Sequence, residues 1–335
     1  MKLLAWVAAA AVAATTASAQ VEIKYANDWK WEGPAAPFLL SLGKGYYADE
    51  GLEVTMDQGA GSLDAIPRVA SGTYQMGSAD VNTLIKFRDQ NPDLEVMAVF
   101  MIYNKPPFAI VGRESLGVSS PKDLEGRTLG APAPDGAYAQ WDAFVAANDI
   151  DAGAVSIENV GFPVREPMLA RGEVDAITGF SFSSFINLKA AGVPEDDINV
   201  LLMADYGLDL YGNVIIVNPA FAEENPEAVS AFLRATIKGM DESFASPAMA
   251  IPYVLERNDV AREAVELERF QMAIDQNFLT DEVAANGIGG IDEARFAAAL
   301  EQIALTYDFE NPLPTPGDIF DSSFLPSKED RMIGQ

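Results

Sequence analysis

The stretch that decides the fold is PFLLSLGKGYYADEGLEV, residues 37–54. An apolar run typical of a helix, residues 38–42, stops at the Gly-Lys-Gly of residues 43–45. Two tyrosines and an acidic turn follow in residues 46–51, and residues 52–54 alternate as a short strand does. The pattern predicts a helix that turns a corner into a strand, which is typical of an α/β protein.

The N-terminus has the features of a secretory signal. Lys2 supplies the positive charge, residues 3–15 are an apolar, Ala-rich run, and Ala-Ser-Ala at 17–19 is a small-residue cleavage site. The alternative, a membrane anchor, is disfavoured because the run is short and has no stop-transfer flank. We therefore expect a periplasmic protein whose mature chain begins near Gln20 and does not insert into the membrane.

The chain contains 0 Cys and 0 His. These absences exclude a cysteine nucleophile, a Ser-His-Asp triad and a Cys/His zinc site. A carboxylate-only cation site is possible in principle, but no EF-hand loop is present. The residues therefore predict no catalytic group, no metal and no cofactor.

The formal net charge is −28. This charge argues against nucleic acid and anionic lipid as partners, because both would be repelled. It does not establish a cationic ligand, since a carboxylate-rich surface also keeps a protein soluble.

Segments typical of strands and helices alternate along the chain, which favours α/β architecture with largely parallel sheets. We expect strands at 21–25, 52–56 and 94–101, and a helical C-terminal part beginning at 226. About 315 residues after the signal are enough for two domains.

Five segments occur in a family-like order: KGYYADEGLEV, GSLDAIPRVASGTYQMGSADV, PKDLEGRTLGAP, MLARGEVDAITGF and NPAFAEENPEAVSAFLRATIKGM. Together they resemble the periplasmic solute-binding proteins of the alkanesulfonate, taurine, nitrate and thiamine-pyrimidine uptake family. The resemblance implies a two-lobed (type II, Venus-flytrap) fold with two hinge crossovers. It predicts a signal peptide at 1–19, a first lobe from 20–112 and 211–335, and an inserted second lobe at 113–210.

Ligands of open α/β sheets bind beyond the carboxyl ends of the strands. Two such lobes facing each other would form a cleft. The residues that follow predicted strands or flank the crossovers are the candidate ligand-binding residues: Asp28, Trp29, Trp31, Ser62, Asp80, Tyr103, Asp135, Tyr138, Phe180 and Tyr211.

Several of these candidates have a second interpretation. Trp29 and Trp31 form a stacking wall or fill the space beside the sheet. Ser62 holds a polar ligand edge or caps a helix, and Asp80 accepts from an amino group or caps the next helix. Arg165, the basic residue nearest to the predicted cleft, is more typical of a solvated helix start.

Aromatic rings and carboxylates dominate the candidate set. This balance favours a flat, nitrogen-bearing ring with amino donors, such as an aminopyrimidine, or an organic cation over aromatic faces. It disfavours a sulfonate or nitrate, which requires cationic or helix-N-terminal donors. Asp28-Trp29 also resembles the Asp-Trp of the thiamine-pyrimidine binders, although residues 30–34 depart from their pattern. Taurine, another sulfonate or nitrate is the alternative ligand.

The resemblance implies a monomeric, non-enzymatic solute-binding component that delivers its small-molecule ligand to an ABC permease and its ATPase. Some relatives of the fold are pyrimidine-biosynthesis enzymes that use His and Cys, and this chain has neither. The remaining alternative of another class is a soluble sensor or chemoreceptor adaptor.

Overall fold

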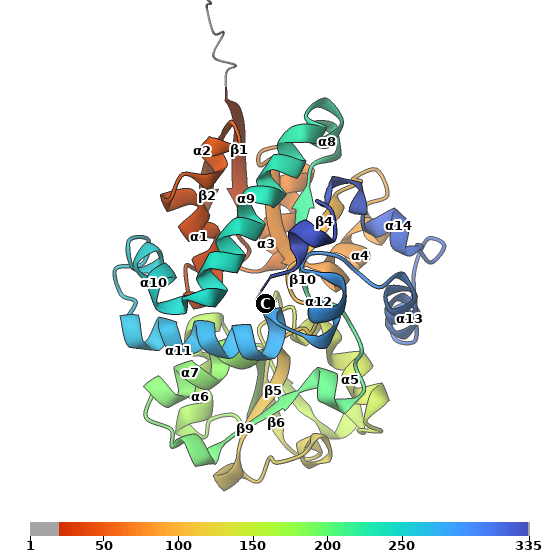
Figure 1. Ribbon diagram of the computed structural model, residues 1–335. Helices are drawn as coiled ribbons and strands as arrows, with labels where there is room; N and C mark the ends of the chain where they lie inside the picture. Colours follow the sequence, from red (N-terminus) through yellow and green to blue (C-terminus); the bar gives the residue numbers. More distant parts are fainter. Residues whose placement is uncertain (1–19, 334–335) are drawn as a thin grey trace, which may run out of the picture.

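The computed structural model describes residues 20–333, which form two α/β lobes joined by two crossovers (Figure 1). The predicted fold class is confirmed, but both sheets are mixed and not largely parallel as expected. The predicted signal at 1–19 lies outside the described residues.

The first sheet has the strand order β2-β1-β3-β10-β4. β1 is parallel to β2 and β3, whereas β10 is antiparallel to β3 and β4. Its strands are β1 (Val21–Ala26), β2 (Leu52–Asp57), β3 (Met76–Asp80), β4 (Met97–Met101) and β10 (Asn213–Val217). β10 is therefore the return of the chain to the first lobe after the second lobe has been completed.

The second sheet repeats this arrangement with the strand order β7-β6-β8-β5-β9. β6 is parallel to β7 and β8, and β5 is antiparallel to β8 and β9. Its strands are β5 (Phe108–Arg113), β6 (Thr128–Gly130), β7 (Ser156–Glu158), β8 (Ala176–Phe180) and β9 (Ile198–Leu202).

Helices cover both sheets, and most of them come from the two chain ends (Figure 1). The second lobe carries α5 (Trp141–Ala147), α6 (Phe162–Arg171) and α7 (Ser181–Ala190). The chain ends supply α1 (Ala36–Gly43), α2 (Tyr46–Asp49), α3 (Ser62–Ala70), α4 (Val81–Gln90), α8 (Pro219–Glu224), α9 (Pro226–Ala245), α10 (Pro247–Leu255), α11 (Glu263–Ala273), α12 (Asp281–Asn286), α13 (Glu293–Ala304) and α14 (Pro316–Ile319). Within residues 20–333, none of the helices combines the length and apolar character needed to cross a bilayer.

The stretch at 37–54 makes the predicted corner. α1 ends at Gly43, and Gly45 has a φ of 77°, which a residue with a side chain rarely adopts. Tyr47 is then buried, its ring stacked on Phe232 of α9 at 4.7 Å, and its hydroxyl is 3.0 Å from Thr236 Oγ1. The corner therefore attaches the C-terminal helix α9 to the N-terminal half of the lobe.

The crossovers are residues 102–107, between β4 and β5, and residues 203–212, between β9 and β10. Arg295 of α13 donates to a backbone carbonyl in each, Asn104 O at 2.8 Å and Leu210 O at 3.0 Å. β5 begins at Phe108 and is already paired within the second sheet. The residue bounds given above for the lobes stay a prediction.

Candidate functional site

A cavity of about 80 Å³ lies where the two lobes face each other. It is lined by the loop after β1, the start of α3 and the head of β10 in the first lobe, and by the loop after β6, α6 and α7 in the second lobe. These are the positions at which the carboxyl ends of parallel strands place loops and helix starts.

Asp28 forms the first-lobe side of the cavity. Its carboxylate accepts from Ser78 Oγ at 3.2 Å and from Asn213 Nδ2 at 2.7 Å, and Ser62 Oγ lies 3.4 Å away. Burial raises the pKa of Asp28, and the bonds from Ser78 and Asn213 oppose that rise. The loop therefore holds one oriented carboxylate against the cavity.

Aromatic rings from both lobes wall the cavity. Trp29 of the first lobe meets Phe162 of α6 edge to face, with ring centroids 4.7 Å apart. The ring centroid of Phe182 on α7 is 5.9 Å from that of Phe180 and 6.1 Å from that of Tyr103 in the first crossover. Such rings offer flat apolar contact area at small entropic cost.

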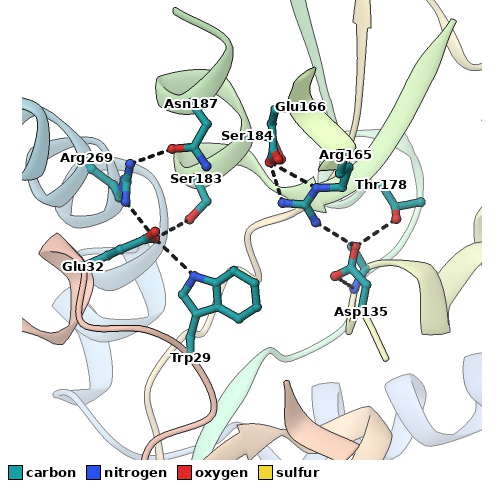
Figure 2. A network of polar contacts seen from close by, with 11 residues as sticks. Trp29, Glu32, Asp135, Arg165, Glu166, Thr178, Ser183, Ser184, Asn187 and Arg269 are labelled. Atoms are coloured by element: carbon teal, nitrogen blue, oxygen red, sulfur yellow. Dashed lines mark hydrogen bonds and ion pairs between the residues drawn. The ribbon is translucent and has the colours of Figure 1, made fainter. Parts of the chain in front are cut away.

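Glu32 joins three separate elements through one oxygen, as Figure 2 shows. Its Oε2 is 2.7 Å from Arg269 Nη1 on α11, and it accepts from Ser183 Oγ of α7 and from Trp29 Nε1, both at 3.2 Å. Arg269 also donates from Nη2 to Asn187 Oδ1 of α7 at 2.8 Å. This cluster links the Trp29 loop to the second lobe.

Arg165 is buried in the cavity wall, not solvated as the sequence indicated. Its guanidinium pairs with Glu166 at 2.6 Å and with Asp135 at 3.3 Å (Figure 2). Thr178 Oγ1 also donates to Asp135 at 2.8 Å. Burial raises the pKa of Asp135, and the neighbouring Arg165 opposes the rise. The positive charge of Arg165 is therefore matched by two carboxylates of its own lobe.

Six of the predicted site residues line the cavity: Asp28, Trp29, Ser62, Tyr103, Asp135 and Phe180. Ser62 does not cap a helix, because its Oγ accepts from Asp80 N–H at 2.9 Å and faces Asp28. Ligand contact by these residues stays a prediction.

Two other candidates do not line the cavity, because one caps a helix and the other packs beside one. Asp80 is the N-cap of α4 and accepts from Asn82 N–H and Thr83 N–H at 3.2 and 2.8 Å. Burial raises its pKa to about 6. Tyr138 packs on the apolar core beside α5.

The last two candidates are also misplaced by the sequence prediction. Trp31 is 5% exposed and belongs to the first-lobe core, because the chain turns inward after Lys30. Tyr211 points to the C-terminal helices, where its hydroxyl donates to Glu282 at 2.7 Å and Arg295 lies over its ring.

Other cavity residues were not predicted, among them Glu32, Phe162 and Asn213. Asn213 had a local signal, since it is a polar residue at the head of the apolar strand Asn213–Val217. Among the described residues, no three His, Cys, Asp or Glu side chains are grouped so that they could hold a metal ion.

Comparisons with known proteins indicate the family of this chain. The family model described as NMT1/THI5 like matches residues 34–250, more than half of the chain. The riboflavin-binding protein RibY of Chloroflexus aurantiacus is 31% identical over 66% of this chain and 62% of its own length. The formylaminopyrimidine-binding protein of Halalkalibacterium halodurans is 27% identical over 70% of each chain.

Solved structures support the fold. The periplasmic aliphatic sulphonate-binding protein SsuA of Escherichia coli has a TM-score of 0.68 at 12% identity, over 91% of this chain and 99% of that one. The periplasmic nitrate-binding protein NrtA of Synechocystis PCC 6803 has a TM-score of 0.67 at 12% identity, over 91% and 87%. The predicted resemblance is confirmed.

The prediction that the chain is not an enzyme is wrong as an exclusion. The 4-amino-5-hydroxymethyl-2-methylpyrimidine phosphate synthase of Aspergillus parasiticus is 24% identical over 75% of each chain, and further relatives carry the same name. The absence of His and Cys was too narrow a criterion, because relatives of this chain include both binding proteins and enzymes.

Proposed function

The chain belongs to the NMT1/THI5-like family, and we propose that it is the solute-binding component of an ABC importer that captures a flat, nitrogen-containing heterocycle between its lobes. In this proposal the signal at 1–19 exports the protein to the periplasm, and the closed, liganded form docks on the permease, whose ATPase drives uptake.

The observation that carries this proposal is an aromatic cavity around an oriented carboxylate. Trp29, Phe162 and Phe182 offer faces and edges to a flat ring, and Asp28 offers acceptors to its N–H groups. A planar heterocycle with N–H donors fits both features at once.

The charges of the cavity support a heterocycle over a sulfonate or nitrate. Arg165 is already neutralised by Glu166 and Asp135. Lys30 is exposed at the rim and lies over the Trp29 ring, 5.1 Å from its centroid. An anion would therefore find Asp28 opposite it and no uncommitted guanidinium beside it.

Contacts across the cleft support the closure on ligand that this proposal requires. Glu32 accepts from Ser183 of the second lobe, Trp29 touches Phe162, and Lys86 of α4 donates to Ala139 O at 2.8 Å. A ligand that bridges the two walls would favour this closed arrangement, so the permease could recognise loading by shape. The names of RibY and the formylaminopyrimidine-binding protein support the ligand class.

A thermal-shift panel tests the proposal. The protein is unfolded and refolded to strip bound solute, and then mixed with 4-amino-5-hydroxymethyl-2-methylpyrimidine, riboflavin, taurine, a longer alkanesulfonate and nitrate. A ligand at a hundredfold excess over its Kd stabilises the folded state by about 2.7 kcal/mol. We expect shifts with a heterocycle alone, whereas a shift with only the sulfonates or nitrate would contradict the proposal.

A further inference from the structure

Asn213 occupies the point where the cavity meets the hinge. It is the first residue of β10, immediately after the second crossover. Its backbone carbonyl accepts from Ile102 N–H at 2.8 Å and from Tyr103 N–H at 3.2 Å, so the two crossovers are tied together at this residue. Its side chain lines the cavity and is 4% exposed.

One half of the Asn213 amide is in use and the other half is not. Nδ2 donates to Asp28 Oδ2 at 2.7 Å, whereas Oδ1 is buried and has no hydrogen-bond partner. Within residues 20–333, a few other buried side-chain polar atoms also lack a partner, but none of them belongs to a residue that lines this cavity. A buried acceptor without a partner is destabilising, so its retention calls for a reason.

Asp28 fixes which way the amide faces. Turning the Asn213 amide over would set Oδ1 against the Asp28 carboxylate, two acceptors in repulsion, and would leave the carboxylate without its donor. Oδ1 is therefore held at the end of the amide away from Asp28. Asn213 and Asp28 both line the cavity, so a ring lying there borders the carboxylate and the residue that carries the unpaired Oδ1.

We propose that Asn213 is a specificity-determining residue, and that its Oδ1 and the Asp28 carboxylate form one acceptor edge that reads N–H donors of the bound heterocycle. The inference rests on the proposed function. It specifies in addition which side of the ligand the protein recognises. The ligand class is a flat heterocycle with an exocyclic amino group or a ring N–H directed at the first lobe. An analogue that presents only acceptors there, with no N–H, would face two acceptors and be rejected.

The test compares two probes that differ in this edge. Calorimetric titration of the refolded full chain measures Kd for 4-amino-5-hydroxymethyl-2-methylpyrimidine and for its 4-methoxy analogue, which has an acceptor oxygen and no N–H at this edge. For a ligand of the riboflavin type, riboflavin is paired with N3-methylriboflavin, which lacks the ring N–H. We expect the wild type to prefer the N–H donor by roughly tenfold or more, and Asn213→Leu to lose most of that preference.

A second asparagine of the cavity provides the control. Asn27 also lines it, but its Nδ2 donates to Trp29 O, and its Oδ1, 3.3 Å from Ser78 Oγ, shares the single Ser78 hydroxyl proton with Asp28. Asn27→Leu should weaken the binding of both probes of a pair alike, so that the ratio of their Kd values stays the same. Asn213→Ser, a smaller change, gives the same readout if the leucine variant does not fold.

The outcomes separate the two proposals. If the wild type binds no heterocycle probe, the proposed function fails and this inference with it. If the wild type prefers the N–H donor and both Asn213 variants keep that preference, the inference alone is wrong. The inference is supported if the ratio of the two Kd values falls towards one in the Asn213 variants and is unchanged in Asn27→Leu.

Discussion

Replacing Glu32 by Ala should lower the free energy of unfolding more than the loss of an exposed ion pair does. The change leaves Arg269, whose side chain is 3% exposed, without its 2.7 Å partner, and it removes the acceptor for Ser183 and Trp29. Removing one member of a buried pair costs about 3–5 kcal/mol. We expect about 3 kcal/mol, the lower end, because Glu266 remains 3.4 Å from Arg269 and can compensate in part.

Chemical denaturation followed by far-UV circular dichroism measures this loss as a shift of the midpoint. Glu173→Ala is the matched control, since Glu173 also pairs with an arginine, Arg171, but on an exposed surface. That variant should unfold at the wild-type midpoint. Glu32→Gln keeps an acceptor and should lie between the two. A loss below about 1 kcal/mol for Glu32→Ala would refute the reasoning, because the pair would then behave as a surface salt bridge.

Three further predictions concern other parts of the structure. Burial raises the pKa of Asp80 to about 6, so the native state binds more protons than the unfolded state between about pH 4 and 6, and this group lowers stability by up to about 3 kcal/mol as pH rises through that window. Asp80→Asn should flatten the melting temperature over the same window, and a profile parallel to that of the wild type would contradict the assignment. A Cβ at Gly61 (φ 106°) would lie 2.9 Å from the Pro134 carbonyl of the other lobe, so Gly61→Ala should disfavour closure and increase the radius of gyration in small-angle scattering. Gly45→Ala, also at positive φ but with open space around it, should not increase it. Arg295→Ala removes donors to both crossovers, so amide exchange there should accelerate about tenfold or more, and unchanged exchange would show that Arg295 does not hold the hinge.

The fold could be predicted from the sequence because its decisive signals are local. The apolar run, the Gly-Lys-Gly stop and the short strand at 37–54 all occur where the structure has α1, the corner and β2. Residues directly after strands were placed well for the same reason, as Asp28 and Trp29 illustrate.

The side chains that the prediction misplaced depend on contacts between distant segments. Trp31 lies in the first-lobe core, and Asn258 Nδ2 donates to its backbone carbonyl from 227 positions away. Tyr211 is drawn to Glu282, 71 positions away. The same holds for Glu32, whose role depends on Arg269 of α11. No local pattern in the sequence encodes such pairs, so only the folded chain reveals them.

Calorimetric titration of the refolded wild-type protein and of Trp29→Ala, with 4-amino-5-hydroxymethyl-2-methylpyrimidine, riboflavin and taurine, tests the central claim most directly. If the lobes close on a flat nitrogen heterocycle, one of the two heterocycles binds at a single saturable site, and the Trp29 variant binds it roughly tenfold more weakly or worse. Taurine gives no saturable heat in this account. Saturable binding of taurine by the wild type, with neither heterocycle bound, would contradict it.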